Sequence, residues 1–514
     1  MNDLIPYIPL SIRDSLASLS FFSAEISLVL GFLFVILADL FFSKRYPQLS
    51  FILALLTLLL TAYQSSGFLK IDSTPLFGGM IIMDHLSILF KLLFCLASIL
   101  FVLFIRFNHA FQSHDKGFGD MYAILLAVHL GLNLMAMSAN LLMIYLSLEM
   151  VSLGSYLMVG YLSSGHKQTE AAMKYALFGA VCSAIMLYGI SLLYGFTGTL
   201  YLSDPEFLSG LKSLPLMSSG LALIMLFIGI AFKLSLVPLH FWSPDVYEGA
   251  PTPVTAFLST APKIAGFAVL IKFMEIFYDP GSKMLSSSIL DLNYILAFLA
   301  ILSMLLGNFV AIWQNSVKRM LAYSSIGHTG FMLMALFIFS TSGFKAIIFY
   351  MTIYVIMNMA AFMLVDEIEE KTGKQNIDEY KGLGKQNSLL MISLLIVLVS
   401  LTGLPPTVGF TAKFLVLSSA LEAYNLSGSP ILLIMIIIAS LSTVVSLFYY
   451  FKIPLNAFLR EASDPVQLSV RSAKVYMGVF LTFLLLLLIV FPSMLEQIFS
   501  LVPFVNKYGI FLKI

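Results

Sequence analysis

The sequence predicts an all-α polytopic membrane protein with about fourteen transmembrane helices. Of its 514 residues, 60% are hydrophobic and only 11% are charged, and the mean hydropathy of +0.97 is far above that of soluble globular domains. Apolar runs of about 20 residues, the length that crosses a hydrocarbon core, recur along the whole chain. The alternation typical of a membrane β-barrel does not occur. We therefore expect a single membrane domain over residues 1–514.

The expected spans begin with the first long apolar run, because the N-terminal segment does not resemble a cleaved signal peptide. This segment has an acidic residue near its start, two prolines, and no small-residue cleavage site after a short apolar core. The fourteen apolar runs cover residues 21–42, 49–66, 80–105, 120–138, 140–162, 169–195, 217–241, 252–276, 292–313, 320–340, 343–365, 388–421, 430–451 and 474–498.

The distribution of positive charge predicts an orientation. Fifteen Lys and Arg residues fall in the loops of one side and six in those of the other, and loops rich in these residues stay on the cytoplasmic side. Both termini are then expected on the outer face of the membrane. The net charge of +1 gives no reason to expect a nucleic-acid partner.

Redox chemistry is not expected in this chain. Its two cysteines, Cys95 and Cys182, both fall inside expected helices and cannot supply the four thiolates of an iron–sulfur centre. No cofactor-binding or metal-binding residues are expected either. Any redox step would therefore occur in another polypeptide.

Two spans contain prolines in their interiors. The seventh reads FIGIAFKLSLVPLHFWSPDVYEGAPTPV and the twelfth reads LVSLTGLPPTVGFTAKFLVL. An interior proline removes a backbone hydrogen bond and clashes with the preceding turn, so Pro238, Pro405 and Pro406 should break their helices. Such breaks are tolerated at membrane depth where the freed backbone lines protein or water.

The two broken helices stand five helices apart, which suggests two five-helix repeats. Because five is odd, the second copy must be inverted relative to the first, as in ion-coupled transporters with broken helices. We expect helices 4–8 to form the first repeat, over residues 116–280, and helices 9–13 the second, over residues 290–455. Helices 1–3 in residues 1–115, and helix 14 with the C-terminus in residues 470–514, would flank them.

Five ionisable residues stand within apolar stretches and are candidate functional residues: Glu149, Lys174, Lys233, Lys263 and Lys413. A charge held at bilayer depth costs about 2.5–3.5 kcal/mol on insertion scales, so five are hard to explain as accidents. A carboxylate on one helix can pair with a lysine on the next, and separating the two lets the lysine pass on its proton. A row of buried lysines therefore suits lateral proton movement, whereas a bare metal cation prefers oxygen ligands.

Other polar residues have a structural explanation beside a functional one. Lys272, near a helix end, is best explained by snorkelling to the membrane interface. For Asp84, Lys91 and Lys345, the interfacial and functional readings remain equally open. His328 could relay protons because a free imidazole titrates near neutrality, or it could be a hydrogen-bonded packing residue.

Five stretches carry a resemblance to a known family: SLEMVSLGSYLMVGY, EAAMKYALFGA, FKLSLVPLHFWSPDVYEGAPTPVTAFLSTAPKIAGF, VKRMLAYSSIGHTGFML and TGLPPTVGFTAKF. They closely resemble the N subunits of bacterial proton-pumping NADH–quinone oxidoreductases (respiratory complex I), which are antiporter-like membrane subunits. The resemblance extends from about residue 80 to residue 455. The motif PDVYEGAPTPVTAF is specific, because related subunits and multisubunit cation/proton antiporters have a PDAH-type sequence there.

The resemblance implies a role for each candidate residue. Glu149 and Lys233 would form a pair between the fifth and seventh helices, with Lys174 modulating it. Lys263 on the eighth helix would connect the two halves, and Lys413 on the twelfth would serve the exit half-channel. The implied partners are other membrane and peripheral subunits, including other antiporter-like subunits, which would bind NADH, FMN, iron–sulfur clusters and quinone.

We therefore expect a membrane subunit that moves protons while partner subunits transfer electrons from NADH to quinone. The alternative in the same class is a subunit of a multisubunit cation/proton antiporter, which the PDVYEG sequence disfavours. A passive scaffold would leave the buried lysines unexplained. A solitary solute carrier is disfavoured because no substrate-type polar pocket is evident in the sequence besides the charged row.

Overall fold

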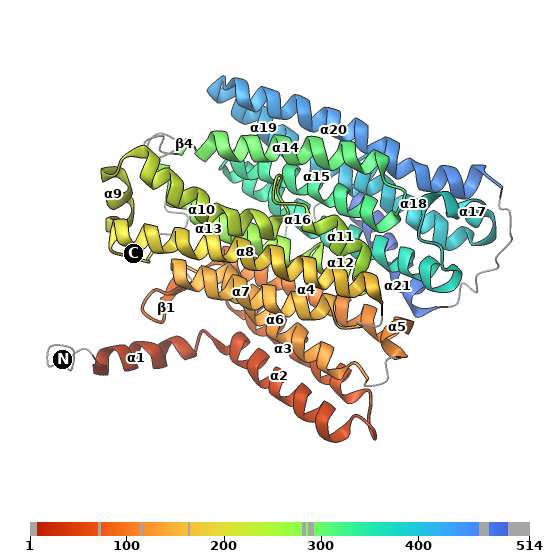
Figure 1. Ribbon diagram of the computed structural model, residues 1–514, viewed down its shortest axis with the longest axis horizontal. Coiled ribbons are helices and arrows are strands. Elements are labelled where there is room, and N and C mark those ends of the chain that lie inside the picture. The colour runs from red at the N-terminus through yellow and green to blue at the C-terminus, as the bar shows by residue number, and fades with distance from the viewer. Residues whose placement is uncertain are drawn as a thin grey trace.

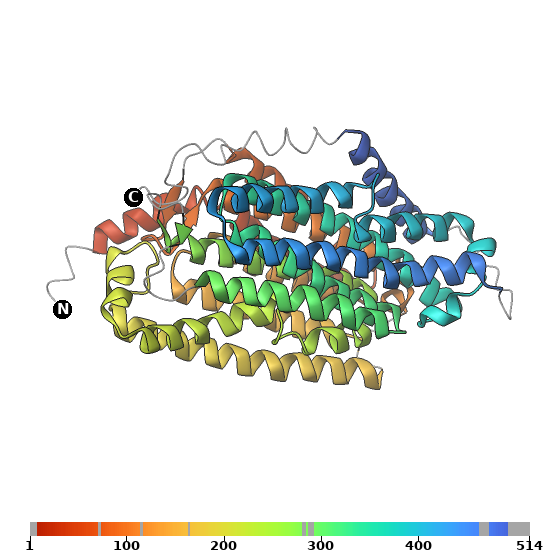
Figure 2. The same cartoon turned by 90° about the horizontal axis from the view of Figure 1, so that it is seen from above.

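The computed structural model describes residues 8–69, 73–113, 117–162, 165–279, 284–285, 292–461 and 472–491. Long helices lie side by side and run roughly parallel or antiparallel to one another (Figure 1). The view from above shows that they pack in several layers (Figure 2). In the described residues, strands are confined to two short antiparallel hairpins, β1–β2 (Thr74–Leu76 and Ile81–Met83) and β3–β4 (Tyr278–Asp279 and Met284–Leu285). The expected all-α membrane fold is confirmed.

The helices alternate with short connections along the whole chain. They are α1 (Ile8–Leu19), α2 (Ser23–Phe42), α3 (Leu49–Gly67), α4 (His85–Phe107), α5 (His109–Gln112), α6 (Gly119–Met137), α7 (Leu141–Val159), α8 (His166–Thr197), α9 (Pro205–Ser213), α10 (Leu216–Leu234), α11 (Trp242–Gly249), α12 (Thr252–Leu258), α13 (Ala261–Glu275), α14 (Leu292–Trp313), α15 (Val317–Phe337), α16 (Thr341–Thr372), the 3-10 helix η2 (Ile377–Tyr380), α17 (Leu383–Gln386), α18 (Ser388–Thr402), α19 (Val408–Ser427), α20 (Pro430–Pro454), the π-helical turn η3 (Leu455–Leu459) and α21 (Ala473–Val490).

The helices coincide with the fourteen expected spans. Thirteen helical segments of the described residues are long and apolar enough to cross a membrane. The interrupted pair α18–α19 supplies the remaining crossing. Helix α18 has 15 residues and is too short to cross the membrane alone. Residues 492–498 of the last expected span, and the C-terminal residues after them, lie outside the described residues.

Both proline-containing spans are interrupted where the sequence predicts. Pro238 lies between α10 and α11, and Pro405 and Pro406 lie between α18 and α19. In each case the first helix ends at a residue in the left-handed conformation, Ser235 with φ 54° or Gly403 with φ 79°. A left-handed residue turns the chain out of the helix, so each break begins before its proline.

The eighth span has a break that the sequence analysis missed, because residues 252–276 read as one apolar run. Ser259 and Thr260 separate α12 from α13, and Thr260 has φ −118° and ψ −86°, outside the helical region. Pro262 lies in the first turn of α13. Proline is accommodated there because the first N–H groups of a helix have no intrahelical partner.

The helix stack has two ends, which we name by one residue each. The Arg319 face is the end at which α6, α8 and α15 begin; α5 and α17 lie there, at the right of Figure 1. The Asp84 face is the opposite end, with the hairpin β1–β2 and α9 at the left of Figure 1. The helix α1, which the sequence analysis did not predict, is fastened to that hairpin because Gly78 N–H donates to Asp14 Oδ2 at 2.8 Å.

Buried ion pairs connect helices that are distant in sequence. Lys91 Nζ of α4 lies 2.8 Å from Glu25 Oε1 of α2, and neither side chain is more than 1% exposed. Asn133 of α6 donates to the same oxygen at 3.1 Å. At the Asp84 face, Lys272 Nζ lies 3.2 Å from Asp84 Oδ2. The expectation that Lys272 snorkels was wrong, because its buried ammonium has a carboxylate partner on another segment.

We expect Glu25→Ala to destabilise the protein strongly. Removing one partner leaves the other charge buried and unpaired, which typically costs about 3–5 kcal/mol. The double variant E25L/K91M removes both charges and should recover most of that loss. Thermal unfolding of the purified protein in detergent would measure both effects. If the single variant were as stable as the double variant, the claim that Glu25 stabilises the buried charge of Lys91 would be wrong.

Candidate functional site

Three of the five candidate residues are fully buried lysines, each beside one of the three helix breaks. The exposed fraction is 1% for Lys233, 1% for Lys263 and 6% for Lys413. Lys233 lies in the last turn of α10, Lys263 in the first turn of α13, and Lys413 in the second turn of α19. Of the three, Lys413 binds a backbone carbonyl at its break, whereas Lys233 and Lys263 bind serine hydroxyls.

Lys233 packs against the helix that carries Glu149. Its Nζ donates to Ser152 Oγ at 3.2 Å, and Ser152 lies one turn beyond Glu149 on α7. The Glu149 carboxylate accepts a hydrogen bond from Ser183 of α8. Lys233 thus contacts the helix of Glu149, the residue with which the resemblance pairs it, but it is bonded to a hydroxyl rather than to the carboxylate.

Lys263 connects α13 to α15. Its Nζ donates to Ser325 Oγ at 2.9 Å and lies 5.8 Å from the centre of the Tyr247 ring. Gly266, one turn later on α13, lets this helix approach α10, since a Cβ atom there would lie 2.9 Å from Leu234 Cδ2. The helix that carries Lys263 therefore packs closely against the end of the helix that carries Lys233.

His328 follows Ser325 by one turn on α15 and is held by two tyrosines. Its Nδ1 lies 2.7 Å from Tyr350 Oη, and its Nε2 lies 3.2 Å from Tyr450 Oη. The ring is almost completely buried. An imidazole bonded on both sides can accept a proton at one nitrogen and release one at the other, so this geometry permits a relay.

Lys413 lies across a small cavity from His328. Both residues line this cavity, together with Asn308 and Tyr449. The Lys413 ammonium donates to the carbonyl oxygen of Thr402 at 2.8 Å, and Thr402 is the last residue of α18. The C-terminal end of a helix carries partial negative charge and unpaired carbonyl groups, so it stabilises a cation there.

The buried contacts form three groups: Lys233 with Ser152, Lys263 with Ser325, and Lys413 with His328 at the shared cavity. Their members come from both halves of the chain. We name these six residues the central row. Amines, hydroxyls and an imidazole all carry exchangeable protons, so the row is chemically able to pass protons sideways.

Lys174 lies outside the central row, near the Arg319 face. Its side chain is 38% exposed and pairs with Glu170 at 2.8 Å and with Asp245 at 2.7 Å. Its position deep in an apolar run was misleading, because α8 has 32 residues. A helix of that length spans about 48 Å, which exceeds the roughly 30 Å of a hydrocarbon core, so its first turns reach the membrane surface.

A charged cavity surrounds Lys174. Arg319 Nη1 lies 2.6 Å from Asp245 Oδ1 and 3.1 Å from Glu248 Oε2. These groups line an open cavity of about 180 Å³ together with Lys167 and Glu170. Asp245 and Glu248 belong to the PDVYEG motif, so the motif lies in the wall of a polar basin, which we call the Lys174 basin.

Lys345 does not join the central row. It is exposed at the start of α16, which fits the interfacial reading. In the described residues, no group of His, Cys, Asp or Glu side chains is arranged to hold a metal ion.

Sequence reasoning missed several residues of the site. Ser325 could have been found, because it lies three residues before His328 and so on the same helix face. Tyr350, Tyr450 and Arg319 gave no such signal, since each comes from a segment distant in sequence from its partner.

Comparisons with known proteins identify the family. Residues 138–446 match the model of the transmembrane family described as NADH:quinone oxidoreductase/Mrp antiporter. A curated relative, NADH-quinone oxidoreductase subunit N 2 of Chloroherpeton thalassium, is 40% identical over 452 residues, which cover 87% of this chain and 86% of the relative. The chain belongs to the subunit N family of NADH-quinone oxidoreductases. The specific PDVYEG motif thus led to the correct family.

Solved structures agree with this membership. A chain of respiratory complex I from Thermus thermophilus is 30% identical, with a TM-score of 0.74, and the match covers 92% of this chain and 98% of that chain. A chain of the Mrp complex from Dietzia is 18% identical with a TM-score of 0.75, covering 94% of this chain and 96% of that one. At that identity, the Mrp likeness concerns the fold alone.

We expect Gly403→Ala to displace Lys413. Gly403 has φ 79°, which costs a residue with a side chain roughly 1–2 kcal/mol, and an added Cβ would lie 2.7 Å from Lys413 Cδ. Gly428→Ala is the matched control, because Gly428 has φ 63° and nothing within 4 Å of an added Cβ. Structures of the two variants would show whether the ammonium leaves Thr402. An unchanged contact in G403A would contradict this prediction.

Proposed function

We propose that this chain is a proton-translocating membrane subunit of a bacterial NADH–quinone oxidoreductase, and that the central row carries the protons. The observation that supports the proposal most strongly is the set of three buried lysines, Lys233, Lys263 and Lys413, which are bonded to a hydroxyl or a carbonyl and come from both halves of the chain. This chain takes part in the enzyme without a redox centre of its own. NADH, FMN, iron–sulfur clusters and quinone would be bound by partner subunits, including the other antiporter-like subunits.

The residues are assigned roles along the row. The Lys174 basin collects protons at the Arg319 face and biases the nearby pair Glu149 and Lys233. When Glu149 moves away from Lys233, the lysine releases its proton toward Lys263, because an ammonium without a carboxylate nearby binds its proton less tightly. Lys263 and His328 then pass the charge to Lys413.

We further propose the inverted-repeat plan for residues 116–280 and 290–455. Breaks in the seventh and twelfth spans support it, because each places a lysine beside a helix end. The charge distribution supports an inner, cytoplasmic position for the Arg319 face, with both termini outside. Of the basic residues in that distribution, Lys70, Lys116, Lys283, Arg471, Lys507 and Lys513 lie outside the described residues.

A subunit of a multisubunit cation/proton antiporter is the alternative function. Purification from native membranes separates the two. Recovery with peripheral subunits that contain flavin and iron–sulfur centres would support the oxidoreductase, whereas recovery with a small set of membrane subunits alone would support the antiporter.

We expect Lys413→Arg to reduce proton pumping severely while the complex still assembles. Arginine keeps the positive charge beside Thr402, but a guanidinium does not release its proton at accessible pH. Lys345→Arg makes the same change at an exposed site and should leave pumping unchanged. Proton transfer per NADH oxidised would be measured in proteoliposomes. Near-normal pumping by K413R would exclude Lys413 as a site that gains and loses a proton.

A further inference from the structure

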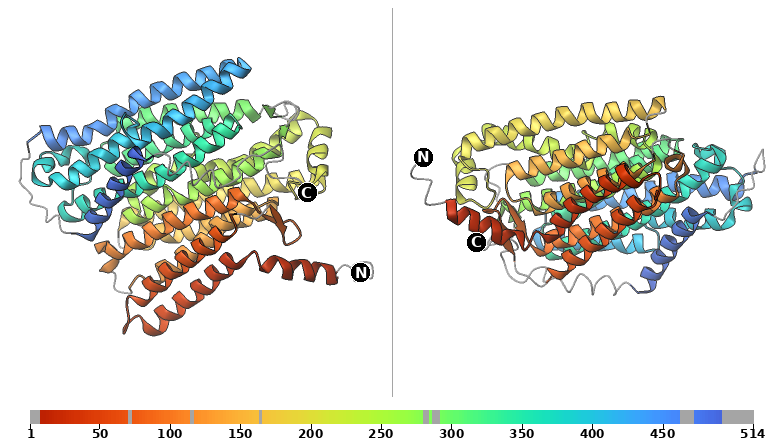
Figure 3. Two further views of the ribbon diagram at one scale, coloured as in Figure 1. Left: turned by 180° about the vertical axis from the view of Figure 1, so that it is seen from behind. Right: turned by 90° about the horizontal axis from the view of Figure 1, so that it is seen from below.

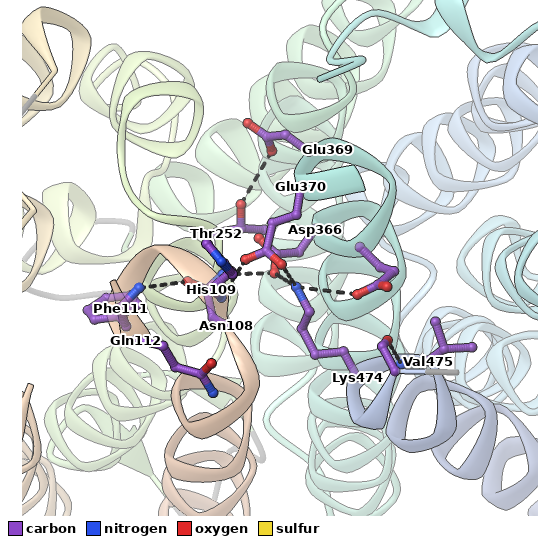
Figure 4. A network of polar contacts seen from close by, with 12 residues as sticks. Asn108, His109, Phe111, Gln112, Thr252, Asp366, Glu369, Glu370, Lys474 and Val475 are labelled. Carbon is purple, nitrogen blue, oxygen red and sulfur yellow. Dashed lines mark hydrogen bonds and ion pairs between the residues drawn. The ribbon is translucent and has the colours of Figure 1, made fainter. Parts of the chain in front are cut away.

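One lysine at the Arg319 face lies among three carboxylates of α16 (Figure 4). Lys474 Nζ lies 2.8 Å from Asp366 Oδ2 and 3.4 Å from Glu367 Oε2, and it also bonds Glu370. The side chains of Lys474, Asp366 and Glu367 are at most 4% exposed. We name these four residues the Lys474 cluster.

The cluster joins three separate parts of the fold. Lys474 lies in the first turn of α21, which crosses the other helices obliquely (Figure 3). Asn108, at the end of α4, donates to Asp366 Oδ2 at 2.9 Å, and the His109 N–H donates to Glu370 Oε1 at 2.8 Å (Figure 4). Asp366 and Glu370 are therefore held by an ammonium and a further N–H group.

Glu367 is less well satisfied, since it has only the Lys474 ammonium nearby, at 3.4 Å. Neither of its carboxyl oxygens accepts a hydrogen bond, although the side chain is buried and directed at Lys474. The Lys318 ammonium of α15 pairs instead with Glu369, 2.8 Å from its Oε2. A buried carboxyl without a hydrogen-bond donor is a poor place for a negative charge.

The net charge of the Lys474 cluster also favours a protonated carboxyl group. Three ionised carboxylates beside one ammonium would leave two negative charges in a buried site. Carboxylates that share one site repel one another when all are ionised, and a proton held by one of them would relieve that repulsion. The carboxylates are not arranged to hold a metal ion in place of that proton.

We propose that the Lys474 cluster stores an exchangeable proton on Glu367 and releases it along the Arg319 face toward the Lys174 basin. The release step rests on the proposed function, whereas the stored proton does not. The cluster is thus a second proton-holding site, separate from the central row.

Ion pairs mark the route between the two sites. Glu370 precedes the end of α16 beside Glu369, which pairs with Lys318. The next residue, Arg319, pairs with Asp245 at 2.6 Å, and Asp245 pairs with Lys174. Charged residues therefore lie along the Arg319 face between the cluster and the basin, joined by ion pairs or adjacent in sequence.

The test compares Glu367→Gln with Glu379→Gln in the intact complex. Glutamine has the shape and neutrality of a protonated glutamate, so E367Q should assemble with an unchanged unfolding temperature. Glu379 is exposed on η2, and backbone N–H groups of Asn376 and Gln375 lower the pKa of its carboxyl, so it is ionised at neutral pH. Infrared spectra in H₂O and D₂O should show a carboxylic-acid carbonyl band that E367Q loses and E379Q keeps.

Proton uptake on the Arg319 side, followed with a pH dye during NADH oxidation, tests the release step. We expect uptake to slow several-fold in E367Q and to be unchanged in E379Q. Failure of E367Q to assemble, or an unchanged infrared band, would overturn the stored proton. A lost band with normal uptake would overturn the release step alone. The proposed function fails separately if K413R pumps normally.

Discussion

A positive charge buried among apolar helices needs a dipole, a hydroxyl or a carboxylate beside it, and this requirement organises the centre of the molecule. An unbroken helix offers a buried lysine no backbone partner, because all its carbonyls are bonded within the helix. The breaks remove that limitation. Lys413 bonds the carbonyl of Thr402 at the end of α18, and Lys263, at the start of α13, bonds Ser325 of α15. These partners support a cation without the permanent negative charge that would trap its proton.

Much of the fold could be predicted because lipid imposes a simple length and polarity on each span. The breaks at Pro238 and Pro406 could also be predicted, since an interior proline disrupts a helix whatever its tertiary contacts. The break before Pro262 was missed because its flanking sequence stays apolar. The depth of a residue in the membrane was also hard to predict from the sequence. Lys174 has apolar neighbours in sequence, but α8 is longer than a membrane span and places Lys174 near the surface.

The contacts of the site were less predictable than its residues. Lys233, Lys263 and Lys413 stand out in the sequence because each is a rare charge in an apolar run. Tyr350 and Tyr450 do not, because tyrosines are common in this chain, and only the packing of α16 and α20 against α15 brings them to His328. Likewise, Glu25 could not be assigned to Lys91, since the pairing depends on how α2 lies against α4.

Glu149 stands on the outward-facing side of α7. It is only half-buried, and Leu146 and Leu153, one turn before and one turn after it, are 50% and 58% exposed. In a solitary subunit this stripe would face hydrocarbon, where a carboxylate is poorly tolerated. A neighbouring subunit that covers α7 would remove that penalty. Glu149 would therefore be better accommodated in an assembly that covers α7 than in a solitary subunit.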